Sequence, residues 1–198
     1  MNSNKLNIGC GNNILDGWVN LDISALPGVD VVHDVEKLPL PFPDEQFDEI
    51  LCQDILEHVE YVPVLRDIYR IMKKGGSLTI RVPHFASKHN FIDPTHKKMF
   101  SINTFDFFVK DSSEQYGRGY YFDFAFASCR EAKIVFEDDL KVFLFVNALF
   151  FIINPLLFLL SVLTEKLVNY SPRMQKIYES TFLSRLVPAC NLLVTLVK

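Results

Sequence analysis

The first third of the chain alternates short apolar runs with turns, and each run stops at or near a glycine or an acidic residue. The three runs are residues 5–8 before Gly9-Cys10-Gly11, residues 18–21 before Asp22, and residues 29–32 before Asp34. Runs of this kind are typical of β-strands. Because α/β proteins bind ligands beyond the carboxyl ends of parallel strands, the pattern predicts a parallel sheet with a site along that edge.

Two further strands are expected at residues 47–52 and 77–82, with a helix between them. Leu65, Ile68, Tyr69 and Met72 recur at helical spacing and predict the buried face of this helix. Pro63 suits its first turn, and Gly75-Gly76 suits its C-terminal end. Strands that alternate with turns and a helix predict an α/β fold.

The composition indicates a globular protein that forms a single domain over residues 1–198. Hydrophobic residues make up 49% of the chain and charged residues 22%, which is enough to bury a core. The net charge is −4 and no cluster of lysines and arginines is present, so we expect no nucleic-acid partner. Four cysteines lie far apart and no leader sequence precedes residue 5, so we expect reduced thiols in a cytoplasmic protein.

The glycine turn and the acid after the second run predict a nucleoside site. Gly9 and Gly11 allow a tight turn close to a ligand, and the Asp22 carboxylate can accept hydrogen bonds from both hydroxyls of a ribose. A dinucleotide site would need a third glycine, where this chain has Ile14, and a helix that hardly fits between Gly11 and Asp22. A nucleoside without phosphates therefore fits better, although both glycines would also serve a simple turn.

At these positions the sequence resembles the class I, Rossmann-like S-adenosylmethionine-dependent methyltransferases, and most closely their small bacterial members. Four segments carry the resemblance: Gly9-Cys10-Gly11 with Gly17-Trp18-Val19-Asn20-Leu21-Asp22, residues 38–48, Glu57-His58-Val59, and residues 70–76. The resemblance extends over about residues 5–105. It implies a seven-stranded, mostly parallel sheet, with the sixth strand at about residues 132–146 and the seventh at 191–197.

The resemblance also implies a cofactor, S-adenosylmethionine, and the residues that bind it. Gly9 and Gly11 would flank the methionine part of the cofactor, and Asp22 would hold the ribose diol. Asp34 and the backbone of Val35 would contact the amino edge of adenine. Gln53 would lie near the methionine amine or the sulfonium. The full set of expected cofactor residues is Gly9, Cys10, Gly11, Asp22, Ile23, Asp34, Val35 and Gln53. Because methyl transfer depends mainly on positioning and on exclusion of water, we expect no metal.

The acceptor site is expected after the fifth strand, around His84 and Asp93-Pro94-Thr95-His96. His96 is the candidate base, because histidine titrates near neutral pH, with Asp93 and His84 as further catalytic candidates. The alternative is that Asp93 and His96 only hold the loop over the cofactor. His33 and His58 are expected to be structural.

An apolar run without any charged residue covers residues 142–164, and a basic segment follows it. We expect an apolar and basic helical insertion at residues 147–187, before the last strand. It would contain one helix at about 154–168 and a second after Ser171-Pro172, with Met174, Ile177, Tyr178, Phe182 and Leu186 on one face. Three alternatives stay open for residues 142–187: contact with a membrane surface, a core, lid or homodimer contact, and a membrane span.

These features predict an S-adenosylmethionine-dependent methyltransferase that modifies an oxygen or nitrogen atom of a small or lipid-linked acceptor. A saccharide or polyprenyl-linked glycan is the first candidate. The predicted location is the cytoplasm, with the inner face of the membrane as the alternative. A non-catalytic binding or membrane-scaffold protein of the same fold is the second hypothesis, and a nicotinamide oxidoreductase is the third.

Overall fold

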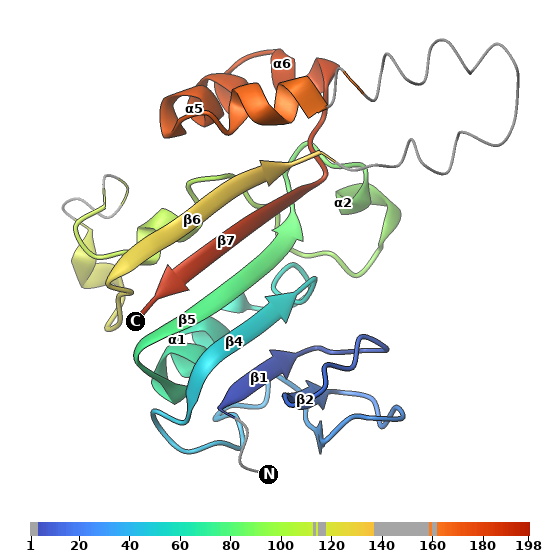
Figure 1. The fold of residues 1–198 in the computed structure, drawn as a ribbon, viewed down its shortest axis with the longest axis vertical. Coiled ribbons are helices and arrows are strands. Elements are labelled where there is room, and N and C mark those ends of the chain that lie inside the picture. The colour runs from blue at the N-terminus through green and yellow to red at the C-terminus, as the bar shows by residue number, and fades with distance from the viewer. Residues whose placement is uncertain (1–3, 113, 115–117, 137–158, 160–161) are drawn as a thin grey trace, which may run out of the picture.

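The computed structural model describes residues 4–112, 114, 118–136, 159 and 162–198, which fold around one seven-stranded sheet (Figure 1). The strands follow the order β3-β2-β1-β4-β5-β7-β6, and every neighbouring pair is parallel except the two pairs that β7 makes. This topology confirms the prediction of a seven-stranded, mostly parallel sheet. The strand bounds are Lys5–Ile8 (β1), Val19–Asp22 (β2), Val31–Val32 (β3), Phe47–Gln53 (β4), Met72–Pro83 (β5), Ser128–Val135 (β6) and Asn191–Val197 (β7).

The connection between β1 and β2 contains no helix, as its length predicts. Two buried asparagines supply the hydrogen bonds that hold this loop. Asn7 donates from Nδ2 to Oδ1 of Asn20 at 3.1 Å, and the same Asn20 oxygen accepts from the backbone N of Leu15 at 3.0 Å. Asn20 also donates from Nδ2 to the carbonyl of Leu15. Because both amides are buried and paired, the loop keeps a fixed path beside the carboxyl end of β1.

Helix α1 (Tyr61–Ile71) packs its apolar face on the sheet, where Leu65 and Ile68 are fully buried. The expected C-terminal end at Gly75-Gly76 is wrong. The helix ends at Ile71, and Met72 already pairs with Phe47 as the first residue of β5. Both side chains are fully buried, so packing of Met72 in the core replaces the last predicted helical turn.

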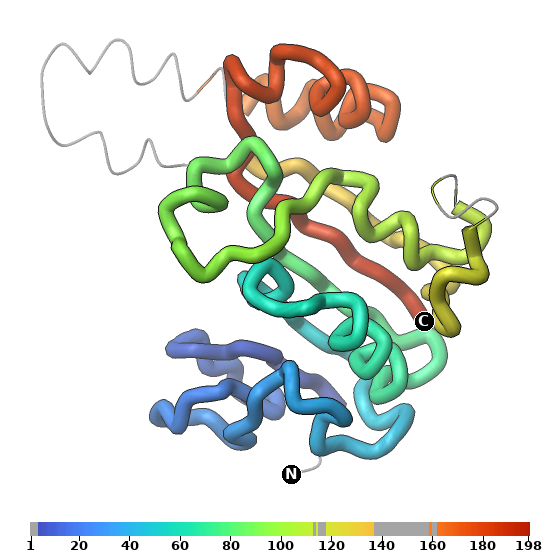
Figure 2. Tube along the Cα trace, turned by 180° about the vertical axis from the view of Figure 1, so that it is seen from behind, coloured from blue at the N-terminus to red at the C-terminus, as the bar shows by residue number. Residues whose placement is uncertain are grey.

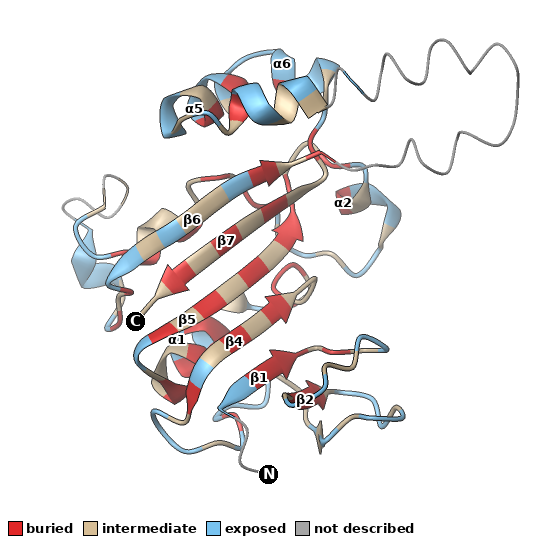
Figure 3. Ribbon diagram, viewed as in Figure 1, coloured by how far each residue is buried: buried red, intermediate tan, exposed pale blue. Residues whose placement is uncertain are grey.

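The two faces of the sheet differ in what covers them. Figure 2 shows α1 and the segment between β5 and β6 lying over one face. On the other face, no helix among the described elements lies over β4, β5 and β7 (Figure 1). The burial of β5 follows this difference: Leu78 and Ile80 are buried, whereas Thr79 and Arg81 are half-buried (Figure 3). The core therefore lies between the sheet and the α1 layer.

The chain between β6 and β7 forms helix α5 (Pro172–Ser180) and the short α6 (Leu183–Leu186), after a helical stretch at residues 162–168. The hydroxyl of Ser171 caps α5 as predicted, accepting a hydrogen bond from the backbone N of Met174 at 3.3 Å. Most of the apolar run lies outside the described residues, as do the last ten residues predicted for the sixth strand. The first helix expected there is described at residue 159 and over residues 162–168, which are helical. No helix in the described part of the chain is long and apolar enough to cross a membrane.

The predicted apolar face of α5 and α6 is wrong in part. Tyr178 is buried as predicted, but Phe182 and Leu186 are 68% and 66% exposed. Gln175, which the apolar pattern did not include, is buried. Gln175 donates from Nε2 to the carbonyl of Ala132 in β6 at 2.8 Å. Among the described strands, none pairs with the outer edge of β6. The side chain of Gln175 therefore bonds to the carbonyl of Ala132 at this edge, and the buried face of α5 is partly polar.

Candidate functional site

Two cavities lie beyond the carboxyl ends of the parallel strands. The first has a volume of about 340 Å³, and we name it the Asp22 cavity. Five of the eight expected cofactor residues line it, whereas Cys10, Gly11 and Gln53 do not. Its lining residues are Gly9, Leu21, Asp22, Ile23, His33, Asp34, Val35, Glu36, Asp54, Ile55, His58 and Val59.

The Asp22 carboxylate is held in place by two backbone groups. The backbone N of Gly11 donates to Oδ2 at 2.8 Å, and the backbone N of Ser24 donates to Oδ1 at 2.8 Å. Gly11 therefore contributes by orienting the acid rather than by lining the cavity. Cys10, which stands between Gly9 and Gly11, is buried. Its burial, together with the negative charge of Asp22, raises the pKa of the Cys10 thiol.

Gly9 is the point where β1 turns into this cavity. Its φ of +65° lies in the left-handed region, which disfavours residues with a Cβ. A Cβ at Gly9 would also collide with the side chain of Ile55, which follows β4 and forms part of the same wall. Both constraints require glycine, so the sequence-based reason for Gly9 agrees with its geometry.

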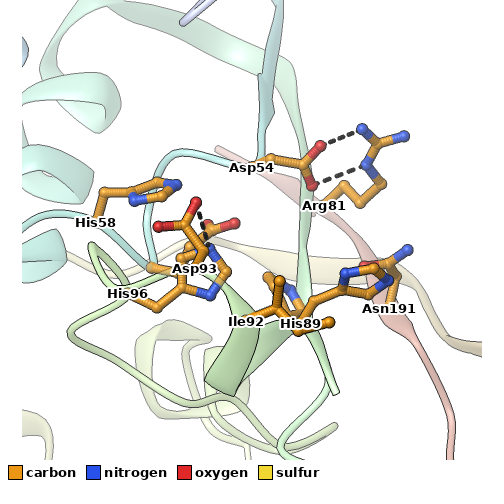
Figure 4. A pocket seen from close by; sticks show the side chains of 10 residues that line it. Asp54, His58, Arg81, His89, Ile92, Asp93, His96 and Asn191 are labelled. Atoms are coloured by element: carbon orange, nitrogen blue, oxygen red, sulfur yellow. Dashed lines mark hydrogen bonds and ion pairs between the residues drawn. The ribbon is translucent and has the colours of Figure 1, made fainter. Parts of the chain in front are cut away.

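The second cavity, the His96 cavity, has a volume of about 430 Å³ and lies at the ends of β4, β5 and β7 (Figure 4). Asp54 and Arg81 form an ion pair on its wall, with Nε of Arg81 at 2.9 Å from Oδ1 of Asp54. Asp54 and His58 also line the Asp22 cavity, so the two cavities meet at these two side chains. The lining residues are Asp54, Glu57, His58, Arg81, Pro83, His89, Ile92, Asp93, His96 and Asn191.

Asp93, Thr95 and His58 form a chain of hydrogen bonds in this cavity. The Thr95 hydroxyl donates to Oδ1 of Asp93 at 2.6 Å and lies 2.8 Å from Nδ1 of His58. These contacts with Thr95 lower the pKa of Asp93. The structure thus brings together two of the expected catalytic residues, Asp93 and His96, and adds His58, which we expected to be structural.

Glu57 is a member of the site that the sequence analysis did not assign a role. Its side chain is 1% exposed, and neither carboxylate oxygen has a hydrogen-bond partner among the described residues. Burial raises the pKa of Glu57 to about 7. The only signal in the sequence was that Glu57 precedes His58 in a segment that carries the family resemblance. The residue spacing around Glu57 does not show that its side chain is buried.

His84 lies apart from the other catalytic candidates. Its ring is fully buried and does not line the His96 cavity. Nε2 lies 3.0 Å from Oε1 of Glu179 in α5, and Nδ1 accepts from the backbone N of Ala86 at 3.1 Å. The same Glu179 oxygen accepts from the backbone N of Ile102. In this position His84 ties the end of β5 to α5 and to the chain after α2 (His89–Ile92).

Comparisons with known proteins show what the first part of this site is similar to. A family model described as a methyltransferase domain matches residues 6–80. An uncharacterised protein of Methanocaldococcus jannaschii is 49% identical over 45 residues, which are 23% of this chain and 20% of that protein. A demethylmenaquinone methyltransferase of Listeria monocytogenes is 41% identical over 54 residues, 27% of this chain and 22% of the enzyme. The chain thus spans about one fifth of the length of these curated relatives.

The fold agrees with this family match. A crystal structure of a SAM-dependent methyltransferase from Archaeoglobus fulgidus superposes with a TM-score of 0.54 at 19% sequence identity. The superposition covers 98% of this chain and 85% of that one. The segment matched by the family model contains Gly9, Asp22 and the Asp54–His58 loop. Residues 6–80 are therefore similar to a methyltransferase domain, and the described residues share the fold of that crystal structure.

Proposed function

We propose that this chain binds S-adenosylmethionine in the Asp22 cavity and transfers a methyl group from it to an acceptor in the His96 cavity. The residues of the Asp22 cavity fit the cofactor. Two backbone donors turn the Asp22 carboxylate so that it can accept hydrogen bonds from a ribose diol. Gly9 leaves room for the methionine part, and Ile23 and Val35 offer apolar surface for adenine.

The observation that carries this proposal is the shared wall at Asp54 and His58, since ligands in the two cavities meet there. When bound, S-adenosylmethionine supplies an activated methyl group. The acceptor atom provides the electron pair of the new bond to the methyl carbon, and the pair of the broken carbon–sulfur bond stays on sulfur. The protein holds the acceptor atom in line and excludes water. Where the acceptor is a hydroxyl or an amine, its proton must leave, and His96 with Asp93 is placed to receive it.

The lining of the His96 cavity favours an acceptor with polar groups. Arg81, His89 and Asn191 offer donors along one side, while Ile92 is apolar and 66% exposed at the rim. This combination supports a hydroxylated head carried on an apolar body, so a saccharide or a lipid-linked glycan stays our first candidate. One relative is named for methyl transfer to demethylmenaquinone, but it matches over 22% of its length, so we take from it the reaction and not the acceptor.

Contact with a membrane surface and formation of a homodimer belong to the same proposal. Leu163, Leu167 and Phe182 are 54%, 60% and 68% exposed in the segment between β6 and β7. Exposed apolar side chains near basic residues suit a surface of anionic lipid. Sedimentation with and without anionic vesicles, at several protein concentrations, separates vesicle binding from self-association.

Calorimetric titration with S-adenosylmethionine and S-adenosylhomocysteine tests the proposal, with NADH as the control ligand. We expect micromolar binding of the first two and none of NADH. Release of S-adenosylhomocysteine on addition of saccharide or lipid-linked acceptors then reports turnover. If neither methionine nucleoside binds, the proposal fails. Binding without turnover for any acceptor would favour the non-catalytic alternative, which the family match does not favour.

A further inference from the structure

Three side chains that meet at the wall of the His96 cavity have the composition of a metal site. They are Glu57, His58 and His96, and one ligand atom from each lies within 4.8 Å of the other two. Glu57 is the decisive member, because a carboxylate that is 1% exposed with two unpartnered oxygens is costly to bury. Asp54 and Asp93 add negative charge nearby, and Arg81 offsets part of it. The environment therefore favours a cation.

The hydrogen bonds of His58 leave one of its nitrogens available as a ligand. The Thr95 hydroxyl has one proton, which it donates to Asp93, so toward Nδ1 of His58 it can act only as an acceptor. Nδ1 of His58 therefore carries the proton, and Nε2 has a free lone pair. A carboxylate that orients a histidine in this way, here through Thr95, is the outer partner that histidine ligands of metals usually have.

His96 is held in a similar state. Its Nδ1 is buried and has no hydrogen-bond partner among the residues that the structure describes. Its Nε2 lies 3.8 Å from Oδ2 of Asp93, so the charge of Asp93 favours a proton on that nitrogen. A neutral ring with its proton on Nε2 has its lone pair on Nδ1, where an ion can bind.

Backbone hydrogen bonds hold the two loops that carry the three residues. The carbonyl of Glu57 accepts from the backbone N of Lys97 at 2.7 Å and of Lys98 at 3.1 Å. The rings of His58 and His96 pack edge to face, with centroids 4.6 Å apart. The three side chains thus lie near one another without an ion, and small side-chain rotations would bring their atoms to the roughly 2.0–2.2 Å that bonds to zinc require.

We propose that Glu57, His58 and His96 bind a divalent transition-metal ion, with open coordination positions toward the His96 cavity. Two imidazoles and one carboxylate form a donor set that suits zinc and similar ions. This proposal departs from our expectation that no metal is needed. With Nδ1 bound to an ion and a proton on Nε2, His96 could not also receive the acceptor proton. If the proposed function is right, the ion would take over that role, binding an acceptor oxygen and helping it release its proton to solvent before the oxygen attacks the methyl carbon.

Titration of the untagged, chelator-treated protein with Co²⁺ tests the metal site in the absence of S-adenosylmethionine. Visible absorption reports cobalt with nitrogen and oxygen ligands, whereas a near-ultraviolet charge-transfer band would report a cysteine thiolate. We expect one equivalent to bind, and Glu57→Gln and His96→Ala to weaken binding by about 100-fold or more. Thr95→Val keeps all three ligands and should weaken binding by about 10-fold. His89→Ala is the matched control, since it removes another imidazole of the same cavity.

The result that overturns the proposal is equal cobalt affinity in wild type, Glu57→Gln and His96→Ala, or a thiolate band, or no binding at micromolar Co²⁺. Thermal melts of each variant without metal show whether it is folded. Cofactor binding is measured separately by calorimetry. If the protein binds S-adenosylmethionine but not Co²⁺, only the proposed metal site is refuted. If it binds Co²⁺ but not S-adenosylmethionine, only the proposed function is refuted.

Discussion

At the scale of single residues, we expect affinity for the proposed cofactor to depend most on Asp22. Asp22→Ala removes the charged acceptor for the ribose and frees the backbone N of Gly11 and Ser24. Hydrogen bonds to charged groups contribute about 1.5–3 kcal/mol each, so we expect affinity for S-adenosylmethionine to fall by about 100-fold or more. Calorimetry measures this loss, and Asp16→Ala, at an exposed acid of the preceding loop, should bind like wild type.

Glu57 gives the metal-free protein a pH-dependent stability. Burial raises its pKa in the folded state to about 7, while an unfolded glutamate titrates near about 4.3. Between these values the folded state binds the proton more tightly, so the free energy of unfolding should decrease as pH rises from about 5 through 7. The full change is at most about 4 kcal/mol.

Urea unfolding at pH 5.5 and 8 in the presence of a chelator measures this effect. Glu57→Gln cannot ionise, so its stability should change less between the two pH values than that of wild type. Glu60→Gln, at an exposed neighbour, should retain the wild-type dependence. If wild type and Glu57→Gln respond equally to pH, then Glu57 is not the group responsible.

At the scale of elements, Tyr178 fastens α5 to the chain that leads into β7. Its hydroxyl donates to the carbonyl of Val187 at 2.7 Å and accepts from the backbone N of Ala189 at 2.9 Å. Tyr178→Phe keeps the packing but leaves both backbone groups unpaired beside a fully buried Ala189. We expect a loss of about 1–3 kcal/mol in the free energy of unfolding. Chemical denaturation tests this, with Tyr170→Phe, 84% exposed, as the unaffected control.

The sequence predicts strands better than it predicts helix faces. The predicted bounds of β1 and β7 agree with the structure, because both strands are short apolar runs with clear ends. For the helix expected after Ser171-Pro172, the periodic apolar pattern predicted that Phe182 and Leu186 are buried, yet both follow α5 and are exposed. The partner of α5 is the polar edge of β6, which lies far away in the chain. Periodicity reports which side chains share a face, and tertiary contacts decide which face is buried.

At the scale of the whole molecule, the Asp22 cavity is built from loops of the N-terminal third and from the loop after β4. Cofactor binding should therefore slow amide hydrogen exchange in residues 9–18, 22–36 and 54–60, because ordering of these loops restricts local opening. We expect β6 and β7 to exchange as they do in the free protein, since they do not line this cavity. Equal protection across the whole chain would indicate global stabilisation instead of a local site.

The site was predictable only in part, because its residues come from distant segments. Glycines and acids at strand ends gave Gly9, Asp22 and Asp34, whose place follows from the parallel sheet alone. The partnership of Glu57 with His96 depends on two loops that are close in space but far apart in the chain, joined by backbone hydrogen bonds and by the contact of Thr95 with His58. His84 resembled a catalytic residue in the sequence, yet its position is set by Glu179, 95 residues later in the chain.

The wall formed by Asp54 and His58 has a thermodynamic consequence. A ligand that reorients either side chain in one cavity changes the surface presented to the other. Reciprocity then requires the acceptor to change the affinity for S-adenosylmethionine by the same factor by which S-adenosylmethionine changes the affinity for the acceptor. In the proposed function, loading of the two substrates would thus be one coupled equilibrium, and exchange of spent cofactor for fresh would be linked to the departure of the methylated product.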